Sequence, residues 1–179
     1  MIKRTLEAPI NNRLFQNKAI VLLGPRQTGK TTLMRKISKA FKGKVYWMTG
    51  EDYITRQELG KHSVSHLKAL VGNSSLVVID EAQYVENIGL TIKLMVDHIP
   101  DVQVIATGSS SLDLLNAVNE PLTGRKWEYH LFPLSYRELR EHNGFIEERG
   151  LLEHRLVYGS YPEVVTRTGE EQAVLQLLA

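Results

Sequence analysis

The eight-residue segment Gly24-Pro25-Arg26-Gln27-Thr28-Gly29-Lys30-Thr31 constrains the fold of this chain more than any other feature. It follows the apolar run Ala19 to Leu23, which has the length and composition of a fully buried parallel strand. After it, apolar residues recur at helical spacing as far as Phe41, and Gly43 supplies a stop. A glycine loop between such a strand and helix directs main-chain N–H groups toward one point. The sequence therefore predicts an α/β fold with a phosphate-binding loop.

The residue types within this loop predict separate roles toward a nucleotide. Gly29 lets the backbone approach the phosphates, Lys30 reaches the β- and γ-phosphates, and the Thr31 hydroxyl is a ligand for Mg²⁺. Arg26 either touches phosphate or points to solvent. We expect Lys30 to be catalytic, and we expect nucleotide contacts from Gly24, Pro25, Arg26, Gln27, Thr28, Gly29, Lys30, Thr31 and Thr32.

Two acidic residues end another apolar run, Leu76 to Ile79. Asp80 at the end of a parallel strand would lie beside the phosphate loop and hold Mg²⁺, and Glu81 can polarise an attacking water. The alternative is that both acids only cap a following helix. A water-activating acid favours hydrolysis over phosphoryl transfer to a small acceptor.

Further strands are predicted at Val45 to Met48 and Val102 to Ala106, with helical stretches between the strands. This alternation predicts a parallel sheet covered on both faces. Trp127 to Phe132 alternates apolar with polar residues and is either a fifth strand or a surface loop.

After Pro133 the pattern becomes helical. Ser135 with Glu138 forms a capping box, and Leu134 with Leu139 forms a hydrophobic staple. Further helices are expected from 151 to 158 and after Pro162. We therefore divide the chain into a core at 1–133 and a small helical lid at 134–179.

Two more segments supply candidate catalytic residues. In the segment Thr107-Gly108-Ser109-Ser110-Ser111, Ser109 is our choice of a γ-phosphate sensor, while Ser110 or Ser111 can cap a helix that begins at Leu112. Arg125 follows a glycine and is either an arginine finger, in cis or in trans, or an exposed surface residue.

The composition narrows the classes of partner and compartment. The net charge is +2, so the overall charge shows no strong footprint for nucleic acid or anionic membrane. The absence of cysteine excludes a disulfide scaffold and thiolate metal sites. The apolar runs are too short to cross a bilayer and the N-terminus lacks a signal-peptide pattern, so we expect no membrane partner and a cytoplasmic location.

Taken together, the motifs resemble a family of predicted AAA+ ATPases that is widespread in archaea and bacteria. The resemblance spans nearly the whole sequence and rests on Gly24 to Thr32, Ile79 to Gln83, Thr107 to Ser111, Gly124-Arg125, Leu131 to Ser135 with Glu138, and Gly159 to Glu163. It implies the P-loop NTPase fold, a parallel sheet of order 5-1-4-3-2 flanked by helices and followed by a small C-terminal helical lid. It also implies that Arg125 is the arginine finger, that Pro162 packs near the adenine, and that Arg4 and Leu6 line the base pocket.

The resemblance further implies a function for the whole chain. We expect it to bind ATP and ADP with Mg²⁺, to hydrolyse ATP slowly, and to move the lid with nucleotide state. Family members usually continue into a C-terminal domain, which we expect to be missing here, and a homo-oligomer is another expected partner. The alternatives are a nucleotide-gated module that binds DNA or protein with little hydrolysis, and a small-molecule phosphotransferase.

Overall fold

The computed structural model describes residues 2–109, 118, 120–167, 169 and 174–175 of the chain. Its strands are β1 (Ala19–Leu23), β2 (Val45–Thr49), β3 (Leu76–Asp80), β4 (Gln103–Gly108) and β5 (Lys126–His130). Its α-helices are α1 (Glu7–Asn11), α2 (Lys30–Ala40), α3 (Tyr53–Leu59), α4 (Val64–Val71), α5 (Ile88–His98), α7 (Tyr136–Asn143), α8 (Phe145–Gly150), α9 (Leu152–Tyr158) and α10 (Pro162–Thr166). A short 3₁₀ helix, η1 (Ala82–Tyr84), follows β3.

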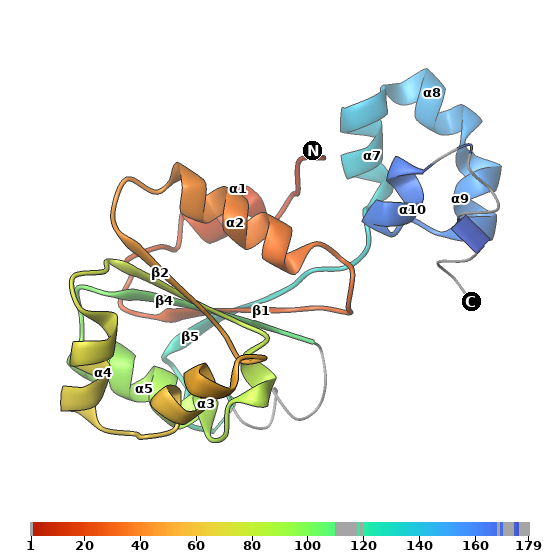
Figure 1. Cartoon of the computed structure of the whole chain (residues 1–179). Coiled ribbons are helices and arrows are strands. Elements are labelled where there is room, and N and C mark those ends of the chain that lie inside the picture. Colours follow the sequence, from red (N-terminus) through yellow and green to blue (C-terminus); the bar gives the residue numbers. More distant parts are fainter. Residues whose placement is uncertain (1, 110–117, 119, 168, 170–173, 176–179) are drawn as a thin grey trace.

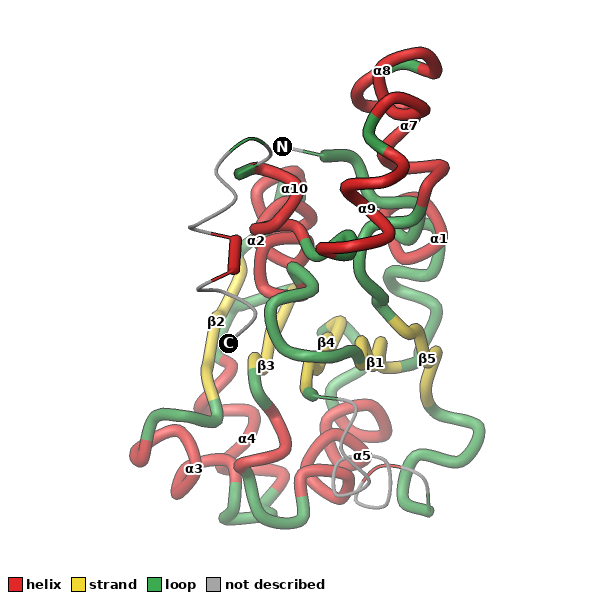
Figure 2. The backbone as a smooth tube through the Cα atoms, turned by 90° about the vertical axis from the view of Figure 1, so that its right-hand side faces the viewer, coloured by secondary structure: helices red, strands yellow, loops and turns green. Residues whose placement is uncertain are grey.

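The five strands form one parallel sheet in the order β2-β3-β4-β1-β5, which confirms the predicted order read from the other edge. Figure 2 shows the strands in this order. Because all of them run the same way, their carboxyl ends share one edge of the sheet. This edge is where ligands bind in open α/β sheets.

Helices cover both faces of the sheet, as alternating strands and helices predict. α1 and α2 lie on one face, while α3, α4 and α5 lie on the other (Figure 1). Side chains alternate along β1, so Ile20 and Leu22 pack with α2 while Val21 and Leu23 pack in the opposite cluster. β1, β3 and β4 are buried along their whole length.

The segment from Trp127 is a strand and not a surface loop. β5 pairs in parallel with β1 from Ala19 opposite Lys126 to Leu23 opposite His130. It is an edge strand whose residues are only partly buried or exposed. This explains why its alternating pattern was weaker than the fully apolar runs of the central strands.

α7, α9 and α10 begin close to where the sequence predicts, whereas α8 was not predicted. Ser135 caps α7 in a complete capping box with Glu138, and Pro162 is the first residue of α10. The helical stretch after α7 is divided into α8 and α9, and Gly144 at φ 95° ends α7. α7 to α10 form a group beside the sheet (Figure 1). Within the described ranges, every helix is too short or too polar to cross a lipid bilayer.

Candidate nucleotide-binding site

The glycine loop joins β1 to α2 as the sequence predicts. Gly29 is the N-cap of α2 at φ 91°, a left-handed backbone that glycine adopts without strain. The Thr28 hydroxyl donates to the Pro25 carbonyl at 2.9 Å. Lys30 Nζ donates to the carbonyls of Gly24 and Pro25 at 2.8 and 2.9 Å, which holds the ammonium over the loop. The loop therefore gathers a cation and a helix N-terminus at one point.

Gly24 has a packing role that motif matching does not reveal. A Cβ at this position would lie 2.2 Å from the Leu131 carbonyl oxygen, where the chain leaves β5. We expect Gly24→Ala to force the loop from the strand and to destabilise the protein by about 1–3 kcal/mol, as overpacking does.

Urea unfolding of Gly24→Ala beside Gly150→Ala tests this expectation. Gly150 has open space around its Cβ position, so Gly150→Ala should change stability by less than about 0.5 kcal/mol. Equal stability of the two variants would contradict the packing role.

The charge state of Lys30 is set by its surroundings. Burial lowers the pKa of the ammonium below its usual value, opposed by the carboxylates of Glu81 and Asp80 and assisted by Arg26. A polyphosphate beside Lys30 would favour the charged form and raise this pKa again. An anion bound beside Lys30 would therefore stabilise the buried, charged ammonium.

Asp80 and Thr31 form the candidate metal site. The Thr31 hydroxyl lies 2.8 Å from Asp80 Oδ2, and the Thr107 hydroxyl donates to Asp80 Oδ1. Mg²⁺ is usually held by one or two carboxylates, with water and substrate phosphates completing its coordination. One carboxylate and one hydroxyl side by side at the phosphate loop fit that ion.

Glu81 stands in a strained conformation beside this site. Its backbone is left-handed at φ 48° and ψ 47°, which is uncommon for a residue other than glycine and clusters at functional sites. Gln83 Nε2 donates to Glu81 Oε2 at 2.6 Å, and the Glu81 N–H donates to the Thr107 hydroxyl at 3.3 Å. Glu81 precedes η1 without a side-chain cap, so the capping interpretation is wrong for this residue.

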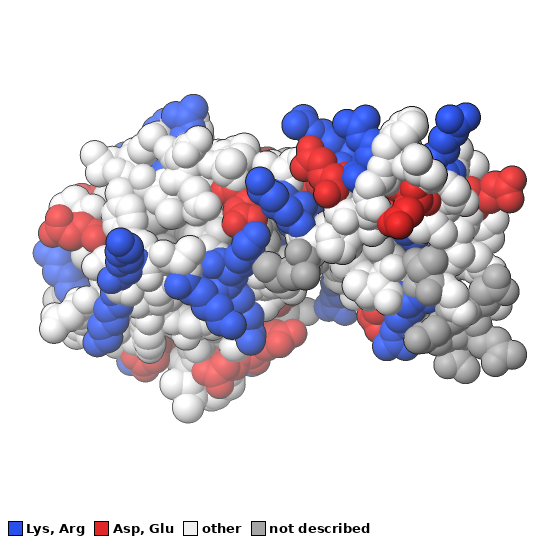
Figure 3. Space-filling view, turned by 90° about the horizontal axis from the view of Figure 1, so that it is seen from above, with Lys and Arg blue, Asp and Glu red and all other residues white. Residues whose placement is uncertain are grey.

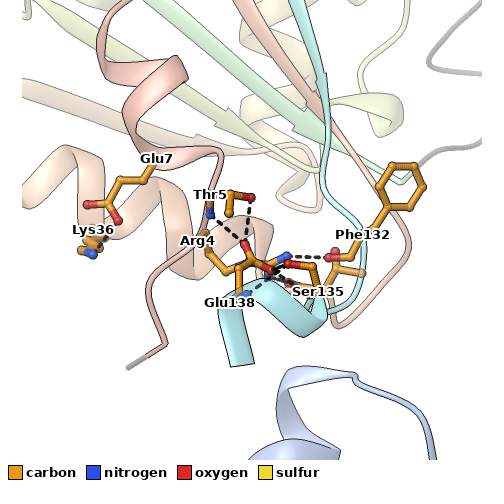
Figure 4. Close-up of polar contacts among 8 residues, drawn as sticks. Arg4, Thr5, Glu7, Lys36, Phe132, Ser135 and Glu138 are labelled. Carbon is orange, nitrogen blue, oxygen red and sulfur yellow. Dashed lines mark hydrogen bonds and ion pairs between the residues drawn. The ribbon is translucent and has the colours of Figure 1, made fainter. Parts of the chain in front are cut away.

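A cavity of about 300 Å³ adjoins the loop. The structure brings Pro162 to this cavity beside Gly29 and Thr32, from the opposite end of the sequence. Figure 4 shows Arg4, which lines the cavity, and the ion pair between Glu7 and Lys36. Lys36 Nζ lies 2.6 Å from Glu7 Oε2, and both residues also line the cavity. The full lining is Ile2, Arg4, Glu7, Gly29, Thr32, Leu33, Lys36, Leu134, Pro162, Glu163 and Thr166. This mostly apolar hollow has the size of a small-molecule pocket.

Arg125 does not lie near the loop of its own chain. Its carbonyl accepts from Ala19 N at the start of β1, whereas the loop follows the end of that strand. A five-residue strand at about 3.3 Å per residue separates the two ends by about 16 Å. Its guanidinium is paired with Asp97 at 2.7 Å. The cis arginine finger is therefore wrong for this geometry, and a role in trans stays a prediction.

The remaining candidates lie as follows. Ser109 comes directly after β4, at the same sheet edge as the loop. Ser110 and Ser111, the alternative helix caps, lie outside the described residues. Arg26 donates to the Tyr84 hydroxyl at 2.9 Å, and Gln27 has a left-handed backbone at φ 63°.

Sequence reasoning missed three contacts. Thr107 was grouped with the serines, but it holds Asp80 and is fully buried. The sequence predicts neither the contact of Gln83 with Glu81 nor that of Arg4, whose guanidinium donates to the Thr28 carbonyl at 2.6 Å. The signal for Thr107 was a hydroxyl at the end of a buried strand, but its contact with Asp80 depends on β3 and β4 being neighbours in the sheet.

Comparisons with known proteins agree with this geometry. Two uncharacterized proteins, from Mycobacterium bovis and Mycobacterium tuberculosis, are each 30% identical to the chain over 138 residues, which is 76% of this chain and 30% of theirs. An uncharacterized protein of Methanocaldococcus jannaschii is 27% identical over 177 residues, which is 90% of this chain and 39% of that protein. The chain thus spans about a third of the length of these relatives.

Solved structures show the same fold. A Walker-type ATPase of Pyrococcus abyssi matches with a TM-score of 0.65 at 18% identity, over 99% of this chain and 72% of that one. A structure of Pif1 helicases unwinding forked DNA matches at 0.51 and 15% identity, over 85% of this chain and 51% of that one. The family model described as AAA domain covers residues 16–140. The chain therefore belongs to the AAA domain family and carries a P-loop ATPase domain of that type.

Proposed function

We propose that the chain binds ATP with Mg²⁺, hydrolyses it slowly, and couples nucleotide state to movement of the helices after Pro133. One observation carries the proposal, namely the contact of 2.8 Å between the Thr31 hydroxyl and Asp80 beside the buried Lys30 ammonium. These groups are a hydroxyl, a carboxylate and an ammonium at one helix N-terminus. Together they suit a triphosphate and its metal.

The residues of the chain divide the work of binding. The loop N–H groups and Lys30 hold the phosphates, while Thr31 and Asp80 hold the metal. Mg²⁺, when bound, neutralises charge on the β- and γ-phosphate oxygens. The base enters the cavity between the segment that carries Arg4 and the first turn of α10 at Pro162.

Glu81 is our candidate for activating the attacking water. A carboxylate there accepts a proton from water as it attacks, and Gln83 fixes one of its oxygens at 2.6 Å. Ser109, at the carboxyl end of β4, is our candidate for sensing the γ-phosphate. A phosphotransferase would need no such acid next to the metal ligand.

The contact between the C-terminal helices and the core supports the coupling. Glu138 of α7 accepts from Arg4 Nε at 3.1 Å and from Thr5 N at 2.7 Å, which joins the start of this region to the segment before α1. Pro162, Glu163 and Thr166 line the same cavity as the first turn of α2. Nucleotide in the cavity would touch both parts and favour one arrangement of them.

Phosphate release by the purified chain, measured with and without DNA and with the mass in solution, tests this proposal. Figure 3 shows Lys and Arg together with Asp and Glu on the face that it draws. The net charge of the chain is only +2, so we expect turnover without DNA. Turnover that begins only with DNA would favour the nucleotide-gated module, and product that forms only with an added acceptor would favour a phosphotransferase.

Arg125 gives a separate prediction about assembly. Arg125 lies at the amino ends of the strands, opposite the phosphate loop of its own chain. A role in catalysis therefore requires that it reach the loop of a second chain. We expect Arg125→Ala to lower turnover about 1,000-fold only under conditions in which copies associate, as loss of an arginine finger does. Turnover is measured against protein concentration, with the exposed Arg137→Ala as control. An equal loss at every concentration would contradict action in trans.

A further inference from the structure

Arg4 makes an unusual set of contacts for a residue outside every motif. The side chain is 9% exposed, and its three nitrogens donate to three different segments of the chain. Nε donates to Glu138 Oε1 at 3.1 Å, one terminal nitrogen to the Thr28 carbonyl at 2.6 Å, and the other to the Phe132 carbonyl at 2.5 Å. Figure 4 shows Arg4 between the start of α7 and the Phe132 carbonyl. A planar guanidinium suits such fixed, forked contacts.

The contact with Thr28 acts on a peptide group of the phosphate loop. The Thr28–Gly29 peptide is trans, so the Thr28 carbonyl and the Gly29 N–H point in opposite directions. By holding the Thr28 carbonyl, Arg4 also fixes the direction of the Gly29 N–H on the other side of the same planar peptide. A cation on the carbonyl also polarises the peptide and makes that N–H a stronger donor.

Glu138 fixes Arg4 in place. Oε1 accepts from Arg4, from Thr5 N at 2.7 Å and from the Thr5 hydroxyl at 3.1 Å, while Oε2 accepts from Ser135 N at 2.9 Å and from the Ser135 hydroxyl at 3.1 Å. Burial alone would raise the pKa of Glu138, but the N–H groups of Ser135 and Thr5 together with Arg4 hold it below its usual value. The carboxylate that caps α7 is thus charged at neutral pH and anchors the guanidinium.

We infer that Arg4 is a positioning residue that aims and polarises the Gly29 N–H for phosphate and ties the phosphate loop to the first C-terminal helix through Glu138. This inference rests on the proposed nucleotide binding. In this role Arg4 acts on the phosphates through the loop, whereas a residue that only lines the cavity would act on the base.

Two other interpretations make different predictions. If Arg4 contacted the base, replacing it would weaken the binding of adenosine and leave the binding of a bare polyphosphate unchanged. If Arg4 formed a purely structural ion pair, replacing it would lower the stability of the protein and leave the affinities of the folded protein for adenosine and for polyphosphate unchanged. The three interpretations therefore separate when ligands with and without base and phosphates are compared.

The experiment compares wild type, Arg4→Gln, Arg4→Lys and the control Arg137→Gln. Arg137 lies on the first turn of α7, is exposed, and pairs only with Glu141 of the same helix at 3.0 Å in the described contacts. Each protein is titrated with Mg²⁺–ATP, Mg²⁺–tripolyphosphate and adenosine. The amide resonance of Gly29 is followed in the same samples.

We expect Arg4→Gln to weaken ATP and tripolyphosphate about tenfold or more, as loss of a charged hydrogen bond does, and to leave adenosine unchanged. Arg4→Lys should recover less than half of this loss, since an ammonium cannot reach three acceptors in a plane. The shift of the Gly29 amide on tripolyphosphate binding should shrink in both variants. Arg137→Gln should match wild type.

Different results would contradict the proposed nucleotide binding and the positioning role of Arg4. If wild type binds neither ATP nor tripolyphosphate, the proposed function fails. If wild type binds both and a folded Arg4 variant binds tripolyphosphate equally well, the inference about Arg4 fails. Should Arg4→Gln not fold, Arg4→Lys, which keeps the charge beside Glu138, decides between these outcomes.

Discussion

Replacing Lys30 by Ala is expected to lower ATP turnover by about 100-fold or more, the loss seen when one donor to developing charge is removed. Lys30 is 4% exposed and is the ammonium nearest the loop carbonyls, which it contacts at 2.8 and 2.9 Å. Its removal leaves the phosphates without their cation. It also removes a buried charge whose desolvation is unfavourable, so the fold should survive.

Lys39→Ala is the matched control for this change. Lys39 lies in the last turn of the same helix and is exposed. Phosphate release and circular dichroism on both variants should give lost turnover with retained structure for Lys30→Ala, and wild-type behaviour for Lys39→Ala. Unchanged turnover in Lys30→Ala would refute the role assigned to this residue.

Glu81→Gln is expected to lower turnover by about 100- to 10,000-fold while ATP stays bound, as loss of a general base does. Glutamine keeps the shape and an oxygen that accepts from Gln83. An amide cannot take the proton of water, so the chemical step stops after binding. Binding should persist because Lys30, Thr31 and Asp80 are unchanged.

Glu86→Gln is the control, because Glu86 is an exposed acid near Glu81 in sequence. Nucleotide retained after gel filtration measures trapping, and phosphate release measures turnover. If Glu81→Gln turned over like wild type, another group would have to activate water. If product formed only in the presence of an alcohol acceptor, the acid next to Asp80 would have no hydrolytic role.

Local patterns predicted the parts of the fold that depend on neighbouring residues. The apolar runs Ala19 to Leu23 and Leu76 to Ile79 are central strands because both faces of a parallel sheet are covered. The capping box at Ser135 is local in the same sense, since its two partners lie three residues apart. The strand order is what the resemblance to a known family implies, and the observed order β2-β3-β4-β1-β5 confirms it.

Contacts between distant segments were beyond local patterns. Glu138 was predicted as a cap, but its second role depends on Arg4, which is 134 residues away in the chain. Thr107 and Asp80 meet because β3 and β4 are neighbours, and a single sequence gives their chemistry without their pairing. For Arg125 the sequence shows the Gly-Arg motif but not its position in space. Its distance from the loop follows from its contact with Ala19 at the start of β1, the end opposite the loop.

Calorimetry of Mg²⁺–ATP with the folded chain tests the central claim most directly. Binding at Gly24 to Thr31 predicts heat from a single site, weaker binding when Mg²⁺ is removed, and no measurable heat with Lys30→Ala. Absence of heat from any adenine or guanine nucleotide with Mg²⁺, in protein shown to be folded, would contradict the claim that this loop binds a triphosphate.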